Sequence, residues 1–141
     1  MAATFKIYTD SGLTTELGST LQLSHNSDLS DNPQDTQLFL GSVGSSLKIE
    51  ANSNPGVDNI TLSIADTTPG SGHETTEIKL ATTSGGLAAA VAGDPLTVGT
   101  VVNSGSGSAF EFWVRVTNAV TTPSQSTELS ISTNTLKEGP Q

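Results

Sequence analysis

Apolar side chains in this sequence recur at every second position, in short runs that glycine- and proline-rich stretches separate. Ile60, Leu62 and Ile64 alternate with polar residues, and the same period holds at Ile78 and Leu80. A period of two places successive side chains on opposite faces of a β-strand, so each run predicts a strand with one buried face. Similar runs, which bring the expected number of strands to about eight or nine, occupy residues 5–8, 21–24, 37–40, 47–50 and 96–98.

Turn-forming residues fill the gaps between these runs, as at 31–33, 68–72 and 104–107. Glycine supplies positive φ angles and proline fixes φ, so these stretches predict tight connections. Only the Leu-Ala-Ala-Ala-Val-Ala segment at 87–92 has a helical composition, and it is long enough for at most about two turns. We therefore predict an all-β chain that folds as one antiparallel β-sandwich with Greek-key connections over residues 1–141.

The two ends of the chain differ from the middle. Residues 1–19 combine a short apolar run with a Gly- and Thr-rich stretch, which predicts an extended N-terminal arm. Such an arm is either an edge strand of the sandwich or a segment that orders by adding a strand to a partner. Residues 134–141 are predicted to be a flexible C-terminal tail.

Composition excludes several classes of partner. Hydrophobic residues make up 33% of the chain but charged residues only 13%, so disorder of the highly charged type is not expected. The net charge of −9 repels phosphate backbones and anionic lipids, so we expect no nucleic acid and no membrane partner. Cysteine is absent, and the first residues lack an apolar run of signal-peptide length, so synthesis without an export signal is expected.

Residues that could carry catalysis do not form a recognisable motif. His25 and His73 lie in polar loop sequence, without a second histidine nearby, so a metal site would need distant carboxylates. No G-x-S-x-G nucleophile motif is present, and no pair of carboxylates is marked for glycoside hydrolysis. The sequence therefore predicts neither an enzyme nor a bound cofactor.

Three carboxylates, Asp28, Asp31 and Asp35, cluster in one loop. Hard oxygen ligands are what Ca²⁺ takes, but the alternating spacing of an EF-hand loop is missing. Two interpretations stay open: a calcium site, or a solvated acidic turn whose side chains bond their own backbone.

The segment from Ala109 to Thr117 is the most informative for binding. In a strand, Phe110, Phe112, Val114 and Val116 share one face, and Glu111, Trp113 and Arg115 share the other. Burying the charged face would be costly, so the aromatic and valine face must be the core. Trp113 and Arg115, the only Trp and the only Arg, then lie side by side on the outside.

This pair has two interpretations. Trp113 is either covered by a loop of its own chain, with Arg115 stacked on it or paired to Glu111, or it contacts another protein. Trp and Arg are enriched at binding hot spots, so we expect a protein interface that also includes residues of the arm. The expected interface residues are Trp113, Arg115, Phe5, Ile7 and Tyr8.

Several segments resemble small virion proteins of tailed bacteriophages, in particular head decoration (capsid cement) proteins with an immunoglobulin-like sandwich. The segments that carry the resemblance are 59–66 followed by a Pro-Gly loop, 96–99, 113–116, 128–132, 5–10 and 37–42. Together they span nearly the whole chain, but each is a pattern of strands and turns.

The resemblance implies a protein that binds the outer surface of an assembled capsid and stabilises contacts between major capsid subunits. It also implies a homo-oligomer, with a trimer as the expected form, made in the host cytoplasm and located on the virion. A phage tail or fibre module, or a bacterial surface adhesion or carbohydrate-binding sandwich, is the alternative. Against the last, sugar-binding faces usually carry several exposed aromatics, and this chain has one Trp and one Tyr.

Overall fold

The computed structural model describes residues 4–18 and 21–141. These residues form ten strands and three 3-10 turns, with no α-helix among them, which confirms the predicted all-β architecture. No helix in the described ranges is long and apolar enough to cross a membrane. The elements are β1 (Lys6–Tyr8), β2 (Gln34–Gly41), β3 (Leu47–Ala51), β4 (Ile60–Asp66), η1 (Thr75–Glu77), β5 (Ile78–Ala81), η2 (Gly85–Leu87), β6 (Leu96–Gly99), β7 (Val102–Asn103), η3 (Ser106–Ser108), β8 (Phe110–Val116), β9 (Leu129–Thr133) and β10 (Leu136–Pro140).

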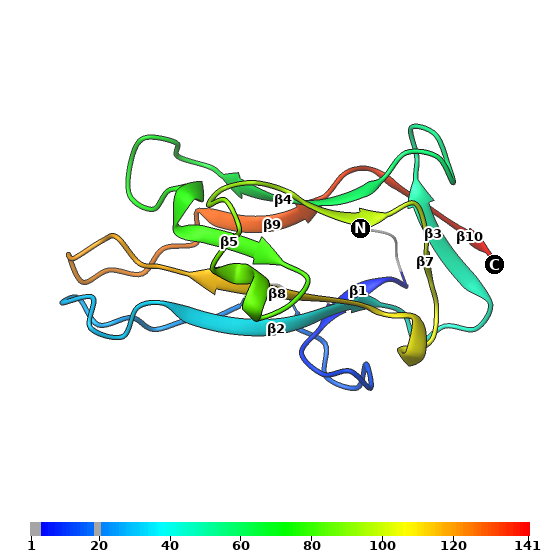
Figure 1. Cartoon of the computed structure of the whole chain (residues 1–141), viewed down its shortest axis with the longest axis horizontal. Coiled ribbons are helices and arrows are strands. Elements are labelled where there is room, and N and C mark those ends of the chain that lie inside the picture. The colour runs from blue at the N-terminus through cyan, green and yellow to red at the C-terminus, as the bar shows by residue number, and fades with distance from the viewer. Residues whose placement is uncertain (1–3, 19–20) are drawn as a thin grey trace.

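Three antiparallel sheets build two layers around one core. One layer is a four-stranded sheet in the order β1-β2-β8-β5, and the other contains the sheet β6-β4-β9. The third sheet, β10-β3-β7, lies at one end of the molecule, at the right of Figure 1. The structure thus has the layers of a β-sandwich, and the immunoglobulin-like topology stays a prediction.

The two smaller sheets are joined by nearly continuous outer strands. Only Asn134 and Thr135 separate β9 from β10. At this junction the Asn134 side chain accepts a bond from the Thr61 N–H (3.0 Å) and donates one to the Asn59 carbonyl (3.0 Å). These bonds replace the backbone ladder where the middle strand is interrupted between β3 and β4.

The inward face of β8 lies in the core, as its alternation predicts. Phe112 and Val114 are fully buried, and Phe110 and Val116 pack against them half-buried. The rings of Phe110 and Phe112 are stacked with centroids 6.3 Å apart. Glu111 is exposed on the opposite face, so the strand's inside and outside are assigned correctly from sequence.

A second, smaller cluster covers part of the outer face of the four-stranded sheet. Tyr8 and Phe39 pair across β1 and β2 and are buried beneath Leu13 and Ala109. The turn that carries Leu13 is held by the Asp10 carboxylate, which accepts bonds from the Thr14 and Thr15 amides. Aromatic residues on both faces of this sheet are therefore buried at the β1 end.

Two expectations for local structure are wrong. Residues 21–24 form no strand: Leu21 and Leu23 are half-buried and alternate with exposed neighbours, but no ladder joins them to a sheet. The predicted flexible tail 134–141 contains strand β10, which pairs with β3 from Leu136–Ala51 to Pro140–Leu47. The polar sequence did not indicate a strand, because β10 lies at the edge of its sheet. An edge strand needs to bury only part of the side chains on one of its faces.

The N-terminal arm is an edge strand in its described part. β1 pairs with β2, and Phe5 just before it is fully buried in the main core. The rest of the predicted arm includes Met1–Ala3 and Ser19, which lie outside the described residues.

Candidate functional site: the outer face of strand β8

Strand β8 presents Glu111, Trp113 and Arg115 on the outer face of the four-stranded sheet. β8 lies between β2 and β5, so each of these side chains has cross-strand neighbours on the same face. We call the resulting surface the β8 patch, and its members are Asp35, Gln37, Lys79, Glu111, Trp113 and Arg115. The alternation along this strand correctly predicts that Trp113 and Arg115 share one face.

Arg115 forms an ion pair with Asp35 rather than with Glu111. The Nε–Oδ1 distance is 2.8 Å and the Nη2–Oδ2 distance is 3.0 Å, which is the two-bond geometry that suits a guanidinium and a carboxylate. The hydrogen bond from Arg115 lowers the pKa of Asp35, and the same bond raises the pKa of Arg115. The charge of the only arginine is therefore neutralised within the chain.

Glu111 is the acceptor for the other half of the patch. Its Oε1 receives a bond from Gln37 Nε2 (2.5 Å) and a longer one from the Trp113 indole N–H (3.3 Å). The indole is thus oriented by a polar contact along its own strand, while its ring remains half-buried. An amphipathic ring held in this way presents apolar surface beside hydrogen-bonding groups, as binding surfaces often do.

A loop of the same chain partly covers this face. The η2 turn contacts both β5 and β8, and it brings the fully buried Leu87 against them. Ala81, the cross-strand neighbour of Trp113 on β5, is also buried. Both interpretations of Trp113 therefore retain support: the η2 turn packs on the strands beside it, and its side chain is only half-buried.

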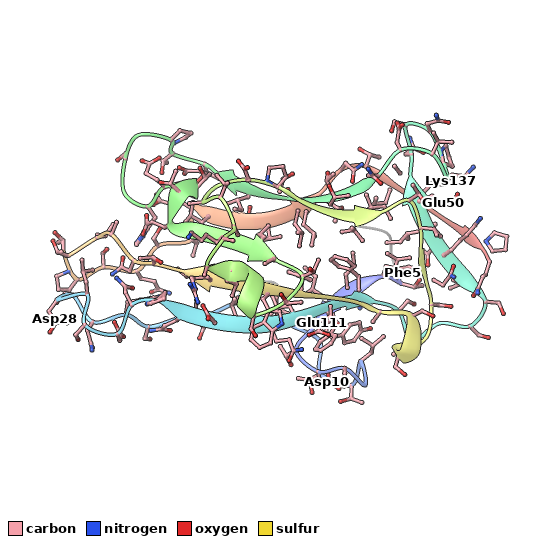
Figure 2. The ribbon with its side chains drawn as sticks, viewed as in Figure 1. Phe5, Asp10, Asp28, Glu50, Glu111 and Lys137 are labelled. Carbon is pink, nitrogen blue, oxygen red and sulfur yellow. The ribbon has the colours of Figure 1, made fainter. Side chains whose placement is uncertain are left out.

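The arm residues do not extend the patch. Phe5 is fully buried, Tyr8 is 6% exposed, and Ile7 is half-buried against the main core. Figure 2 shows Phe5 between the two layers. The expectation that Phe5 and Tyr8 form a protein interface is therefore wrong for this structure, because both lack accessible surface.

The three aspartates of the 28–35 loop do not converge. Asp28 accepts from the Ser30 amide, Asp31 from the Asn26 amide, and Asp35 binds Arg115. Figure 2 shows Asp28 at the tip of one end of the molecule. Within residues 4–18 and 21–141, no three His, Cys, Asp or Glu side chains are placed to hold a metal ion. The geometry favours the acidic-turn interpretation over a calcium site.

A buried carboxylate that sequence analysis missed joins the segment that leads into β5 to the segment that follows β8. Glu77 is 6% exposed and accepts bonds from His73 Nδ1 (2.9 Å), the Glu74 amide (2.7 Å) and the Ala119 amide (2.9 Å). Burial raises the pKa of Glu77, but the bonds from His73 and the two amides outweigh this and lower it. His73 and Glu74 are close in sequence, but the Ala119 amide is 42 positions away, so the local sequence does not show that this carboxylate is buried.

Glu128 extends the same arrangement. It accepts a bond from the Thr68 hydroxyl (2.6 Å) and another from the His73 amide. The Thr68 hydroxyl lowers the pKa of Glu128, and the His73 amide lowers it further. The Glu128 carboxylate thus ties the 66–74 loop to the chain just before β9. The cluster of Glu77, His73 and Glu128 is therefore explained by its role in holding loops together.

A groove of about 1180 Å³ opens between the layers beside β9. Its floor includes Leu38, Ile78 and Val114, and the β9 wall is formed by Leu129, Ser130 and Ile131. The facing wall comes from residues 21–27, which contain the apolar alternation that formed no strand. His25 lies on this wall, with its Nδ1 bonded to Asn32 (2.9 Å).

Neither the family models, nor the curated proteins, nor the solved structures compared with this chain match it.

Proposed function

We propose that this chain is a protein-binding structural module, namely a head decoration protein of a tailed bacteriophage. It binds the outer surface of the assembled capsid as a homo-oligomer and stabilises contacts between major capsid subunits. The resemblance of its strand and turn segments to such proteins suggested this role. The β8 patch supplies the surface through which the binding takes place.

The observation that carries the proposal is the position of Trp113. Its ring lies half-buried on an outer sheet face, fixed by Glu111 and flanked by the Arg115–Asp35 pair. Fixed aromatic rings beside a pre-paired arginine lose little conformational freedom on binding, which is why such residues dominate hot spots. The acidic surface also suits a protein that lies on the outside of a shell, away from DNA.

Sedimentation with undecorated shells of the phage that encodes the chain tests the proposal. Wild-type protein should pellet with the shells. Trp113→Ala should remain in the supernatant at concentrations where wild type is bound, because hot-spot truncations cost about 2 kcal/mol or more, roughly thirtyfold in affinity.

Thr97→Ala is the matched control, since Thr97 is exposed on β6 in the opposite layer. It should pellet like wild type, and both variants should unfold at nearly the wild-type temperature. If wild type does not pellet, the decoration function is wrong. If Trp113→Ala pellets as well as wild type, the shell is bound through another surface.

A further inference from the structure

The outer edge of β9 differs from the other sheet edges of the described chain because no device protects it from pairing with another strand. Exposed edges usually carry charges, proline, bulges or covering segments. β9 has the sequence Leu-Ser-Ile-Ser-Thr, with neither charge nor proline, and pairs with β4 in regular register over all five residues.

Each of the other edges is protected. β1 is covered by residues 15–17, through the Tyr8–Glu16 bridge and the bond from Leu17 N to Ile7 O (2.8 Å). β5 receives a bond from the Gly93 amide (2.8 Å), and β7 has only two residues. β10 carries Lys137, Glu138 and Pro140, and β6 follows Pro95 and pairs with β4 through an irregular register.

The hydrogen-bond alternation of the β4–β9 pair shows which groups face the free edge. The Thr67 amide donates to the Glu128 carbonyl (3.1 Å), one register position beyond the Asp66–Leu129 pair. Bonded and non-bonded pairs alternate along an antiparallel ladder, so Ser130 and Ser132 make the bonds to β4. The N–H and C=O groups that point away from β4 belong to Leu129, Ile131 and Thr133.

The groove beside this edge has the chemistry to receive a strand. Leu129 and Ile131 pack their side chains toward the core, and the floor beyond them is formed by apolar residues of β2, β5 and β8. A strand added to β9 would therefore place alternate apolar side chains in the groove. The hydrogen bonds of residues 24–26 run to positions 30–34 rather than to β9.

We propose that β9 pairs with β9 of a second copy of this chain, antiparallel about a two-fold axis at Ile131. In this register Leu129 faces Thr133 of the second copy and Ile131 faces its counterpart, so all the outward backbone groups find partners. The side chains of Leu129 and Ile131 of each copy then enter the groove of the other. The product is a continuous sheet β6-β4-β9-β9-β4-β6.

Charge in this register does not oppose a second copy at close range. Glu128, the charged residue next to β9, faces Asn134 of the second copy, so no carboxylate opposes another across the new ladder. At longer range two chains of net charge −9 repel one another. Added salt screens that repulsion, so pairing through β9 should strengthen as ionic strength rises.

The two-fold contact differs from the trimer implied by the resemblance, and it does not depend on shell binding.

Exposed serines on β9 provide a register-specific test. The exposed side chains of Ser130 and Ser132 lie on the face of β9 opposite Leu129 and Ile131, and in the proposed dimer Ser130 faces Ser132 of the second copy in a close, non-hydrogen-bonded pair. Ser130→Asp with Ser132→Asp places carboxylates opposite one another and should weaken dimerisation about tenfold or more at low salt. Ser130→Lys with Ser132→Asp places opposite charges together and should restore or exceed wild-type dimerisation.

Sedimentation velocity over a range of concentrations and salt measures the dissociation constant for each protein. Thr82→Asp with Thr97→Asp is the control of equal net charge, at exposed positions away from β9, and should dimerise more tightly than the double-aspartate β9 variant. A reversible wild-type dimer, strengthened by salt and ordered in this way among the variants, supports the pairing. A wild-type chain that stays monomeric, or a dimer equally sensitive to both aspartate pairs, overturns it.

Discussion

Arg115 on β8 and Asp35 on β2 are 80 positions apart in sequence and form a two-bond ion pair on the outer sheet face. The only other cation adjacent in register is Lys79, which lies opposite Arg115 on β5. Arg115 thus lies between the Asp35 carboxylate on β2 and the second cation, Lys79, on β5. The pair fixes the position of the guanidinium more than it adds to folding stability.

Substitutions of the two neighbouring cations, Arg115 and Lys79, should therefore affect the melting temperature differently. Arg115→Lys should lower the melting temperature slightly, because an ammonium group cannot reproduce the two parallel bonds. Lys79→Gln should leave it unchanged or raise it, because it removes a like charge from beside Arg115. Thermal unfolding at low and high salt measures both, and salt should reduce the difference between the two variants.

Phe112 tests the buried face of β8. Phe112→Ala removes a fully buried ring that stacks on Phe110, and it should lower the free energy of unfolding by about 3–5 kcal/mol. Glu111→Ala on the exposed face should cost far less. Urea denaturation of both variants provides the comparison, and a larger loss for Glu111→Ala would reverse the assignment of inside and outside.

Phe5 tests whether the N-terminal strand belongs to the core of the isolated chain. Its ring is fully buried, so Phe5→Ala should also lower the free energy of unfolding by about 3–5 kcal/mol. Lys6→Ala, which removes an exposed pair with Glu16, should have little effect. If Phe5→Ala leaves the urea midpoint unchanged, the arm does not pack on its own chain in solution.

Glu77 should make stability depend on acid pH. Its pKa is lowered in the folded chain, so its contribution is complete above its ordinary pKa near 4.5 and is lost as pH falls through the lower folded value. Glu77→Gln places an amide where two backbone N–H donors point, which should cost about 1–3 kcal/mol at neutral pH. The variant should also lose less stability than wild type on acidification.

Glu74→Gln is the matched control for this prediction. Glu74 is the neighbouring carboxylate, and it is only half-buried, unlike Glu77. Its substitution should leave the dependence of the melting temperature on pH close to that of wild type. An identical acid response in wild type and Glu77→Gln would show that Glu77 is not the group that titrates.

Features that depend on alternation within one strand can be predicted from the sequence, whereas contacts between distant segments cannot. The face of β8 follows from Glu111 and Arg115 alone, because burying either charge is costly. The pairing of Arg115 with Asp35 requires the β2–β8 register, which local sequence does not encode. The bond that Glu77 accepts from the Ala119 amide was missed for the same reason, because it spans 42 positions.

Leu21 and Leu23 show the opposite failure. Their alternation is real in the structure, where they line one wall of the groove, but no ladder joins their backbone to a sheet. Alternation reports which side chains are buried, whereas a strand also requires backbone partners within reach. The expectation for Phe5 was wrong for the same reason. Its apolar side chain predicts burial, but the sequence does not show whether it is buried by its own chain or by a partner.

The C-terminal strand provides the last prediction. β10 covers one edge of β3, and the final residue bonds back through Gln141 N to Ser46 O (2.8 Å). Truncation after Thr135 would remove the β3–β10 ladder and expose β3, an edge with buried Ile49 and Ala51. Exposed apolar edges template aggregation, so the truncated chain should melt at a lower temperature and aggregate on heating.

Lys137→Ala in the full-length chain is the control, because it keeps the ladder and should melt near the wild-type temperature. Equal melting of the truncated and full-length chains, measured by circular dichroism with light scattering, would mean that residues 136–141 form a free tail in solution.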